Sequence, residues 1–188
     1  MTEPLAPRKH RFTIKTFHQI HSLGFLPTNQ RCELIEGEII SRPLLSSVHA
    51  NQILKILNHL TRCIDGKTLV NMHNPVHLGQ YSEVEPDLCL LTLNSHYYHQ
   101  NLPCAEDILL AIEIVDPQSS AYVRKVKMPL YARHGITEAW LIDSEQQFID
   151  VGRAPAAQGY TQIKRYKTTD TIYPQLMPNV AINVKHLF

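Results

Sequence analysis

An almost unbroken apolar run, ILLAIEIV, occupies residues 108–115. It is apolar on both faces of an extended chain and is followed by Asp116 and Pro117, a pattern typical of a buried central strand. One carboxylate, Glu113, interrupts the run. Because an unpaired buried carboxylate is costly, we expect Glu113 to be neutralised, ion-paired or bound to a metal. The alternative is a strand end at which Glu113 reaches water or pairs with an arginine.

The spacing of apolar residues becomes helical after this strand. At about 100° per residue, one stripe contains three apolar side chains, Val123, Val126 and Leu130. We therefore predict a helix over residues 121–134. Lys127 lies inside the stripe, where it can approach Glu113, whereas Lys125 lies on the opposite side. The alternative for Lys127 is a side chain that extends past the rim of the core. Pro129 is expected to end or kink the helix locally.

Alternation and turn residues elsewhere predict a set of shorter elements. The sequence CELIEGEIIS predicts a tight hairpin around Glu36-Gly37, and residues 81–85 are interpreted as a polar turn. Helices are expected over residues 13–24, capped by Thr13, and from about Ser47 to Cys63. Strands are expected at residues 68–79, 86–91 and 137–143, followed by a meander around Phe148, Tyr160 and Tyr166.

These elements predict an α/β (α+β) fold with a restriction-endonuclease-like layout, namely a central mixed sheet flanked by helices. The strand around Ile112 is placed near the centre of the sheet, between the helices at 47–63 and 121–134. We interpret residues 1–11 as a flexible N-terminal arm and residues 12–188 as a single domain. A chain of 188 residues suits one core, and no repeat or linker divides it.

Composition and charge are those of an ordinary globular protein, with 44% hydrophobic and 19% charged residues. The formal net charge of +1 means that a nucleic-acid partner would need a local basic groove. The chain begins without an apolar targeting segment and contains no run of about 18 apolar residues, so we expect a cytoplasmic protein with no membrane partner. The cysteines lack CxxC spacing and are interpreted as free buried thiols, at Cys32, Cys63, Cys89 and Cys104.

Two carboxylates and one ammonium group form the candidate chemistry. Asp87 opens the strand at 86–91, Glu113 lies near the end of the next strand, and Lys127 follows on the helix. Carboxylate oxygens hold Mg²⁺, and such an ion activates water and neutralises charge on a phosphate. A nearby ammonium group can orient the nucleophile or stabilise the developing charge. This set therefore favours metal-assisted hydrolysis of phosphodiester bonds.

The motif order strengthens this interpretation. The segments ELIEGEII, PDLCLL, AIEIV and YVRKVKMPLYARHGITEAWLID follow one another, and this order resembles the Uma family of restriction endonucleases within the PD-(D/E)XK nuclease superfamily. The resemblance implies an endonuclease that cleaves DNA, with Mg²⁺ as cofactor and Mn²⁺ as a substitute. It assigns the metal to Asp87 and Glu113, catalysis to Lys127, and an outer role to Glu33. A homodimer is the expected assembly to test.

The chain departs from the family's pattern at two positions. Val123 stands where the family usually has an aspartate four residues before the lysine, and Asp116 replaces a usual serine. The inward position of Lys127 in the helical stripe predicts that Lys127→Ala abolishes metal-dependent cleavage while leaving the fold and most metal affinity intact, whereas Lys125→Ala retains activity. The alternative is a catalytically weakened, nucleic-acid-binding or structural descendant of the nuclease fold. A zinc site is disfavoured because the histidine pairs, His73 with His77 and His96 with His99, lack matching cysteines.

Overall fold

The computed structural model describes residues 9–64, 66 and 68–188. Most of the expected N-terminal arm, residues 1–8, lies outside the described residues. The main sheet has six strands in the order β10-β9-β8-β7-β6-β3. Only the β7–β8 pair is parallel, so the sheet is mixed as predicted. The strands are β3 (Thr68–Met72), β6 (Leu88–Thr92), β7 (Ile108–Val115), β8 (Glu138–Asp143), β9 (Phe148–Ala156) and β10 (Gly159–Lys167).

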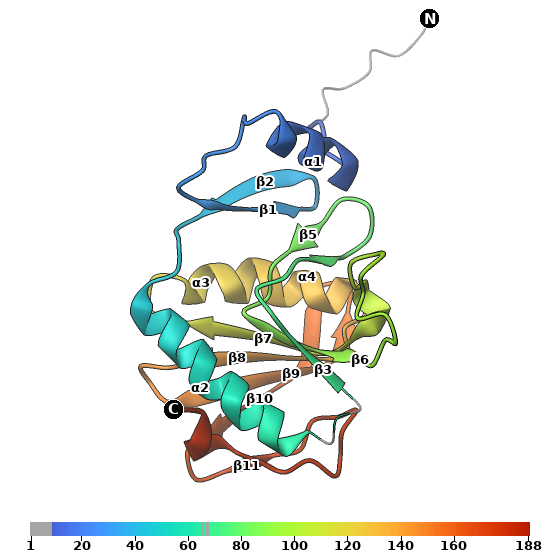
Figure 1. Ribbon diagram of the computed structural model, residues 1–188. Coiled ribbons are helices and arrows are strands. Elements are labelled where there is room, and N and C mark those ends of the chain that lie inside the picture. The colour runs from blue at the N-terminus through green and yellow to red at the C-terminus, as the bar shows by residue number, and fades with distance from the viewer. Residues whose placement is uncertain (1–8, 65, 67) are drawn as a thin grey trace, which may run out of the picture.

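The expected central strand, β7, lies between β6 and β8, and its Leu110 and Ile112 side chains are fully buried. Helix α2 (Ser47–Cys63) packs on one face of the sheet against Leu110 and Ile112. A second helical segment, residues 120–133, packs on the face that carries Ala111. Figure 1 shows α2 crossing the sheet, with α3 and α4 on its upper side. The two predicted helices therefore flank the sheet as expected.

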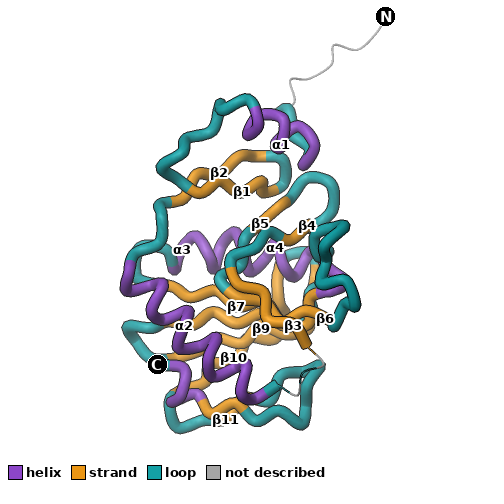
Figure 2. The backbone as a smooth tube through the Cα atoms, in the orientation of Figure 1, coloured by secondary structure: helices purple, strands orange, loops and turns teal. Residues whose placement is uncertain are grey.

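A second, four-stranded antiparallel sheet was not predicted. Its order is β2-β1-β5-β4, and it lies beyond α3 and α4 from the main sheet (Figure 2). It contains β1 (Arg31–Ile35), β2 (Glu38–Arg42), β4 (Val76–His77) and β5 (Glu83–Val84). The prediction of a polar turn at residues 81–85 was wrong, because Glu83 and Val84 are buried and pair with β1 and β4. The predicted strand at 68–79 is divided into β3 and β4.

The hairpin at Glu36-Gly37 is confirmed. Both turn residues have positive φ, 50° and 85°, as a type I′ turn requires, and glycine adopts such an angle without strain. Gly37 is also crowded, because a Cβ there would meet Arg11 Cβ at 2.5 Å. Helix α1 (Ile14–Ser22) begins as predicted, with the Thr13 hydroxyl accepting from the Thr16 amide. The turn thus fixes the register of β1, the strand that carries Glu33.

The helical segment after β7 does not end at Pro129. It consists of α3 (Ser120–Tyr122), a π turn (Val123–Lys127) and α4 (Met128–Arg133). In the π turn the Met128 amide donates to the Val123 carbonyl, five residues back. Proline has no amide hydrogen and clashes with the carbonyl four residues before it in a regular α-helix. The widened turn upstream lets the chain pass Pro129 and continue.

The remaining elements complete the structure beside α2. They are the 3₁₀ turn Val184–Leu187 and the short pair β11 (Thr171–Ile172) and β12 (Ile182–Asn183), whereas a further 3₁₀ turn, Ala105–Asp107, follows Cys104, which bridges to His77 of β4. No helix among the described residues is long and apolar enough to cross a membrane. All four cysteines are free as predicted, but only Cys89 is buried, and Cys104 is exposed. The expectation of buried thiols is therefore wrong for three of them.

Candidate active site

The pairing of β6 with β7 brings the two predicted metal ligands together. Leu88 is opposite Ile112, so Asp87 and Glu113 stand opposite each other one step further along. Directly opposed residues of an antiparallel pair have Cβ atoms about 4.5–5.5 Å apart. Asp87 Oδ2 also accepts a 2.8 Å hydrogen bond from the Ile114 amide. Neither carboxylate has any exposed side-chain surface.

Lys127 reaches this pair from the π turn. Its Nζ lies 2.8 Å from Glu113 Oε1 and 2.9 Å from Glu33 Oε1, and it donates to the Glu85 carbonyl at 3.2 Å. Lys127 is fully buried, whereas Lys125 is exposed, so the predicted inward face of the helix is confirmed. Burial lowers the pKa of Lys127, but Glu113 and Glu33 outweigh it and raise the pKa overall. The ammonium group therefore stays charged.

The two oxygens of Glu113 have different surroundings. Oε1 receives the Tyr131 hydroxyl as well as Lys127. Oε2 is buried and, like Asp87 Oδ1, has no hydrogen-bond partner among the described residues. Burial raises the pKa of Glu113, and Asp87 adds to the rise against the attraction of Lys127. Buried carboxylate oxygens without partners are unusual, and a bound cation would satisfy them.

Glu33 comes from the small sheet and faces the same ammonium group. It is 1% exposed, and its Oε1 accepts from the Glu85 amide at 2.7 Å while its Oε2 accepts from Arg42 at 3.3 Å. Burial raises the pKa of Glu33, but Lys127 and Arg42 hold it below the ordinary value. Glu33 is therefore an ion-paired carboxylate that joins the small sheet to the helix.

Two histidines approach Asp87 from other elements. His49 Nε2, on α2, lies 3.2 Å from Asp87 Oδ1, and His73 Nδ1 lies 3.9 Å from it. Neither approach has hydrogen-bond geometry, since Asp87 Oδ1 remains without a partner. Burial alone would raise the pKa of Asp87, but His49, the Ile114 amide and Lys127 lower it overall. Asp87 thus stays ionised more readily than Glu113, whose pKa is raised.

His73 and His77, one of the two pairs considered for a zinc site, contact different carboxylates. His73 lies near Asp87, while His77 Nε2 contacts Glu83 Oε2 at 2.8 Å. Throughout the described part of the chain, no group of three or more His, Cys, Asp or Glu side chains is placed to hold a metal ion. A metal held by Asp87 and Glu113 would therefore need further ligands from water, backbone or substrate. Mg²⁺ characteristically binds in this way, through one or two carboxylates.

Both departures from the family's pattern have structural explanations. Val123 is fully buried in the apolar cluster between the helical segment and the main sheet. Asp116 Oδ1 accepts from the amides of Gln118 and Ser119 at 3.0 and 2.8 Å, and these bonds lower its pKa. Val123 thus packs in the core, and Asp116 orders the turn that leads into α3.

Residues 14–185 match the model of the Uma2 family, described as "Putative restriction endonuclease". The chain belongs to the Uma2 family. The match covers almost the whole chain, as the motif order predicted.

A solved structure shares the Uma2 chain's fold. It is a "putative nuclease belonging to DUF820" from Anabaena variabilis ATCC 29413, and it aligns with a TM-score of 0.73 at 21% identity, covering 94% of this chain and 97% of the other. The likeness confirms a nuclease-type fold. No match was found among curated proteins.

Several residues of this Uma2 site were not singled out from the sequence. Tyr131 belongs to the segment that carried the family resemblance but was given no role there, although it lies four residues after Lys127 and hence on the same face of the helix. Arg42 and the Glu85 backbone became visible only through pairings between distant strands, which the sequence does not specify.

Proposed function

We propose that this Uma2 protein is a metal-dependent endonuclease that hydrolyses phosphodiester bonds of DNA, with Asp87 and Glu113 as ligands of Mg²⁺. The observation that carries the proposal is the pair of buried oxygens without partners, Asp87 Oδ1 and Glu113 Oε2. The other oxygen of each carboxylate is already held, by the Ile114 amide and by Lys127 with Tyr131. Each side chain therefore presents one oxygen to a ligand.

The residues present fit Mg²⁺ better than Zn²⁺. Two carboxylates without cysteine, and with histidines outside bonding geometry, form a hard oxygen donor set. Mn²⁺ accepts the same ligands and is expected to substitute. A bound divalent ion would supply activation of water and neutralisation of charge at the phosphate.

Lys127 has two tasks in this proposal. Its three nearby oxygens, on Glu33, Glu113 and Glu85, match the three N–H groups of an ammonium. It therefore holds Glu113 in one orientation and keeps a positive charge beside the place where a phosphate would bind. To donate to water or phosphate it must first exchange one partner, and the Glu85 carbonyl is the most distant of the three.

The direct test is nicking of supercoiled plasmid DNA with Mg²⁺ or Mn²⁺. We expect cleavage that EDTA stops and that Asp87→Asn and Glu113→Gln abolish, while calorimetry shows divalent-ion binding by the unmodified protein and its loss in Glu113→Gln. Intact plasmid despite measurable ion binding would favour the inactive descendant. Absence of ion binding would overturn the assignment of the two ligands. Light scattering would test the homodimer, which stays a prediction.

A further inference from the structure

The candidate catalytic groups are covered by protein on every side. Asp87, Glu113 and Lys127 have no exposed surface, and Glu33 is 1% exposed. A cavity of about 410 Å³ opens beside them. Two of its lining residues touch the site, since Arg42 donates to Glu33 and His49 lies 3.2 Å from Asp87. The cavity therefore approaches the carboxylates without being lined by them, and a phosphate would reach them past Arg42 and His49.

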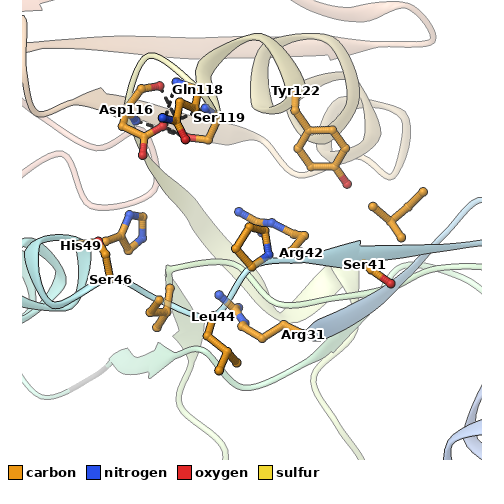
Figure 3. A pocket seen from close by; sticks show the side chains of 13 residues that line it. Arg31, Ser41, Arg42, Leu44, Ser46, His49, Asp116, Gln118, Ser119 and Tyr122 are labelled. Carbon is orange, nitrogen blue, oxygen red and sulfur yellow. Dashed lines mark hydrogen bonds between the residues drawn. The ribbon is translucent and has the colours of Figure 1, made fainter. Parts of the chain in front are cut away.

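The cavity walls come from three separate elements. Figure 3 shows Tyr122 on the helical segment, Arg42 at the end of β2 and His49 on α2 around the same opening. The Tyr122 hydroxyl and His49 Nε2 are buried and lack hydrogen-bond partners among the described residues. Leu44, 60% exposed, adds an apolar surface at the rim. Cationic, aromatic and apolar groups together are the features that bind a phosphate and its attached base.

The approach continues beyond Tyr122. A second cavity of about 460 Å³ shares Ile40 and Tyr122 with the first and is lined by Lys9, His10 and Arg11 together with the acidic residues Glu36 and Glu38. The acidic residues along the path include two that are already paired. Glu38 contacts Lys9 at 2.8 Å, and Asp116 accepts the amides of its own turn. The two cavities thus adjoin across the Tyr122 ring; the first carries the cationic side chains Arg31 and Arg42, and the charges that line the second balance.

We propose that the substrate enters as a single strand of DNA, with a phosphate at Arg42 and His49 and the adjoining nucleotides along Tyr122 and Leu44. The inference rests on the proposed function and narrows its substrate. Cavities of about 300–1,000 Å³ are the size of small-molecule sites. A duplex is stiff over about 150 base pairs and cannot fold into such a cavity, whereas a single strand can. A duplex would be cleaved only where its strands are separated, at a flap, a gap, a frayed end or a segment that negative supercoiling unwinds in a plasmid.

The first test compares fluorescent oligonucleotides of one sequence as a single strand, a blunt duplex, and a duplex with a single-stranded flap. Binding is measured by anisotropy in Ca²⁺ and cleavage on gels in Mn²⁺. We expect at least about tenfold tighter binding of the single strand than of the blunt duplex, with cleavage confined to unpaired segments. Equal binding and cleavage of the blunt duplex would overturn the inference and leave the nuclease proposal standing. Tighter binding of the single strand without any cleavage would support the inference and overturn the nuclease proposal.

The second test uses two leucines that differ in position only. Leu44 lies at the cavity rim, and Leu54 on α2 is similarly exposed at 55% but lines neither cavity. Leu44→Glu and Leu54→Glu add the same charge, so general repulsion of DNA is matched between them. We expect Leu44→Glu to weaken binding of the single strand by about tenfold relative to Leu54→Glu. Equal affinities of the two variants for the single strand would show that Leu44 does not contact the DNA.

Discussion

Replacement of Lys127 by methionine tests the central contact of the structure. The ammonium group lies 2.8 Å from Glu113 and 2.9 Å from Glu33, and all three side chains are at most 1% exposed. Removing one member of a buried ion pair and leaving the other charged costs about 3–5 kcal/mol. The substitution leaves two buried carboxylates, so the upper end of this range applies. The sequence pattern predicted an intact fold, whereas these contacts predict a weakened one.

The expected size of the change can be stated as a melting temperature. For a protein of about this length, 1 kcal/mol shifts Tm by about 2–4 °C, so a loss near 5 kcal/mol in Lys127→Met should lower Tm by roughly 10–20 °C. Lys125→Met is the matched control. It removes the same charge from the exposed side of the same π turn and should change stability by no more than about 0.5 kcal/mol.

A double-mutant cycle isolates the electrostatic cause. In Lys127→Met the carboxylate of Glu113 is left without its cation, so adding Glu113→Gln should recover part of the lost stability. Thermal unfolding followed by circular dichroism would measure all four proteins at neutral pH. A Tm of Lys127→Met within about 2 °C of the unmodified protein, or strictly additive losses in the cycle, would refute the reasoning.

Three further predictions concern groups around this contact and in the scaffold. Tyr131→Phe removes the second donor to Glu113 Oε1. The free energy of unfolding should fall by about 1–3 kcal/mol, and any cleavage should lose turnover rather than DNA affinity. Unchanged stability and turnover would contradict this role. Burial raises the pKa of Asp150, but the hydrogen bonds from Arg165 and Arg124 outweigh burial, so the pKa is lowered overall. The stability that Asp150 contributes is therefore present above its unfolded pKa and is lost as pH falls through its folded pKa. Asp150→Asn should therefore destabilise by about 1–3 kcal/mol at pH 7 and progressively less toward acid in pH-dependent melts; a constant difference would argue against the ion pairs. Gly37→Ala should lower Tm more than Gly24→Ala, because both have similar positive φ but only Gly37 is crowded by Arg11; equal losses would leave backbone strain as the sole cause.

Local periodicity predicted the parts of the structure in which a single pattern dominates. The apolar run around Ile112 and the helical stripe containing Lys127 identified a central strand and an inward lysine, and both were confirmed. These predictions succeed because burial of a whole face is encoded in consecutive residues. The opposition of Asp87 and Glu113 also followed once their strands were recognised as neighbours.

Short elements held by distant partners could not be predicted in this way. Strand β5 has two residues, Glu83 and Val84, and exists because β1 and β4 pair with it. The π turn depends on how the helical segment accommodates Pro129 against the sheet, a tertiary requirement that residue spacing does not express. Arg42 reaches Glu33 through the same unpredicted sheet. The outer contacts of the site therefore became visible only with the fold.

The place of Lys127 on a helix has a consequence for the proposed nuclease activity. A lysine on the same strand as its glutamate would stay beside it in any state in which that strand persists. Here Lys127 is 14 residues from Glu113 and 94 from Glu33, and the three groups belong to three different layers. Detachment of any one layer, in a nascent or damaged chain, separates them. In the proposed nuclease, cleavage would therefore require complete folding, and partly folded copies would leave the DNA around them uncut.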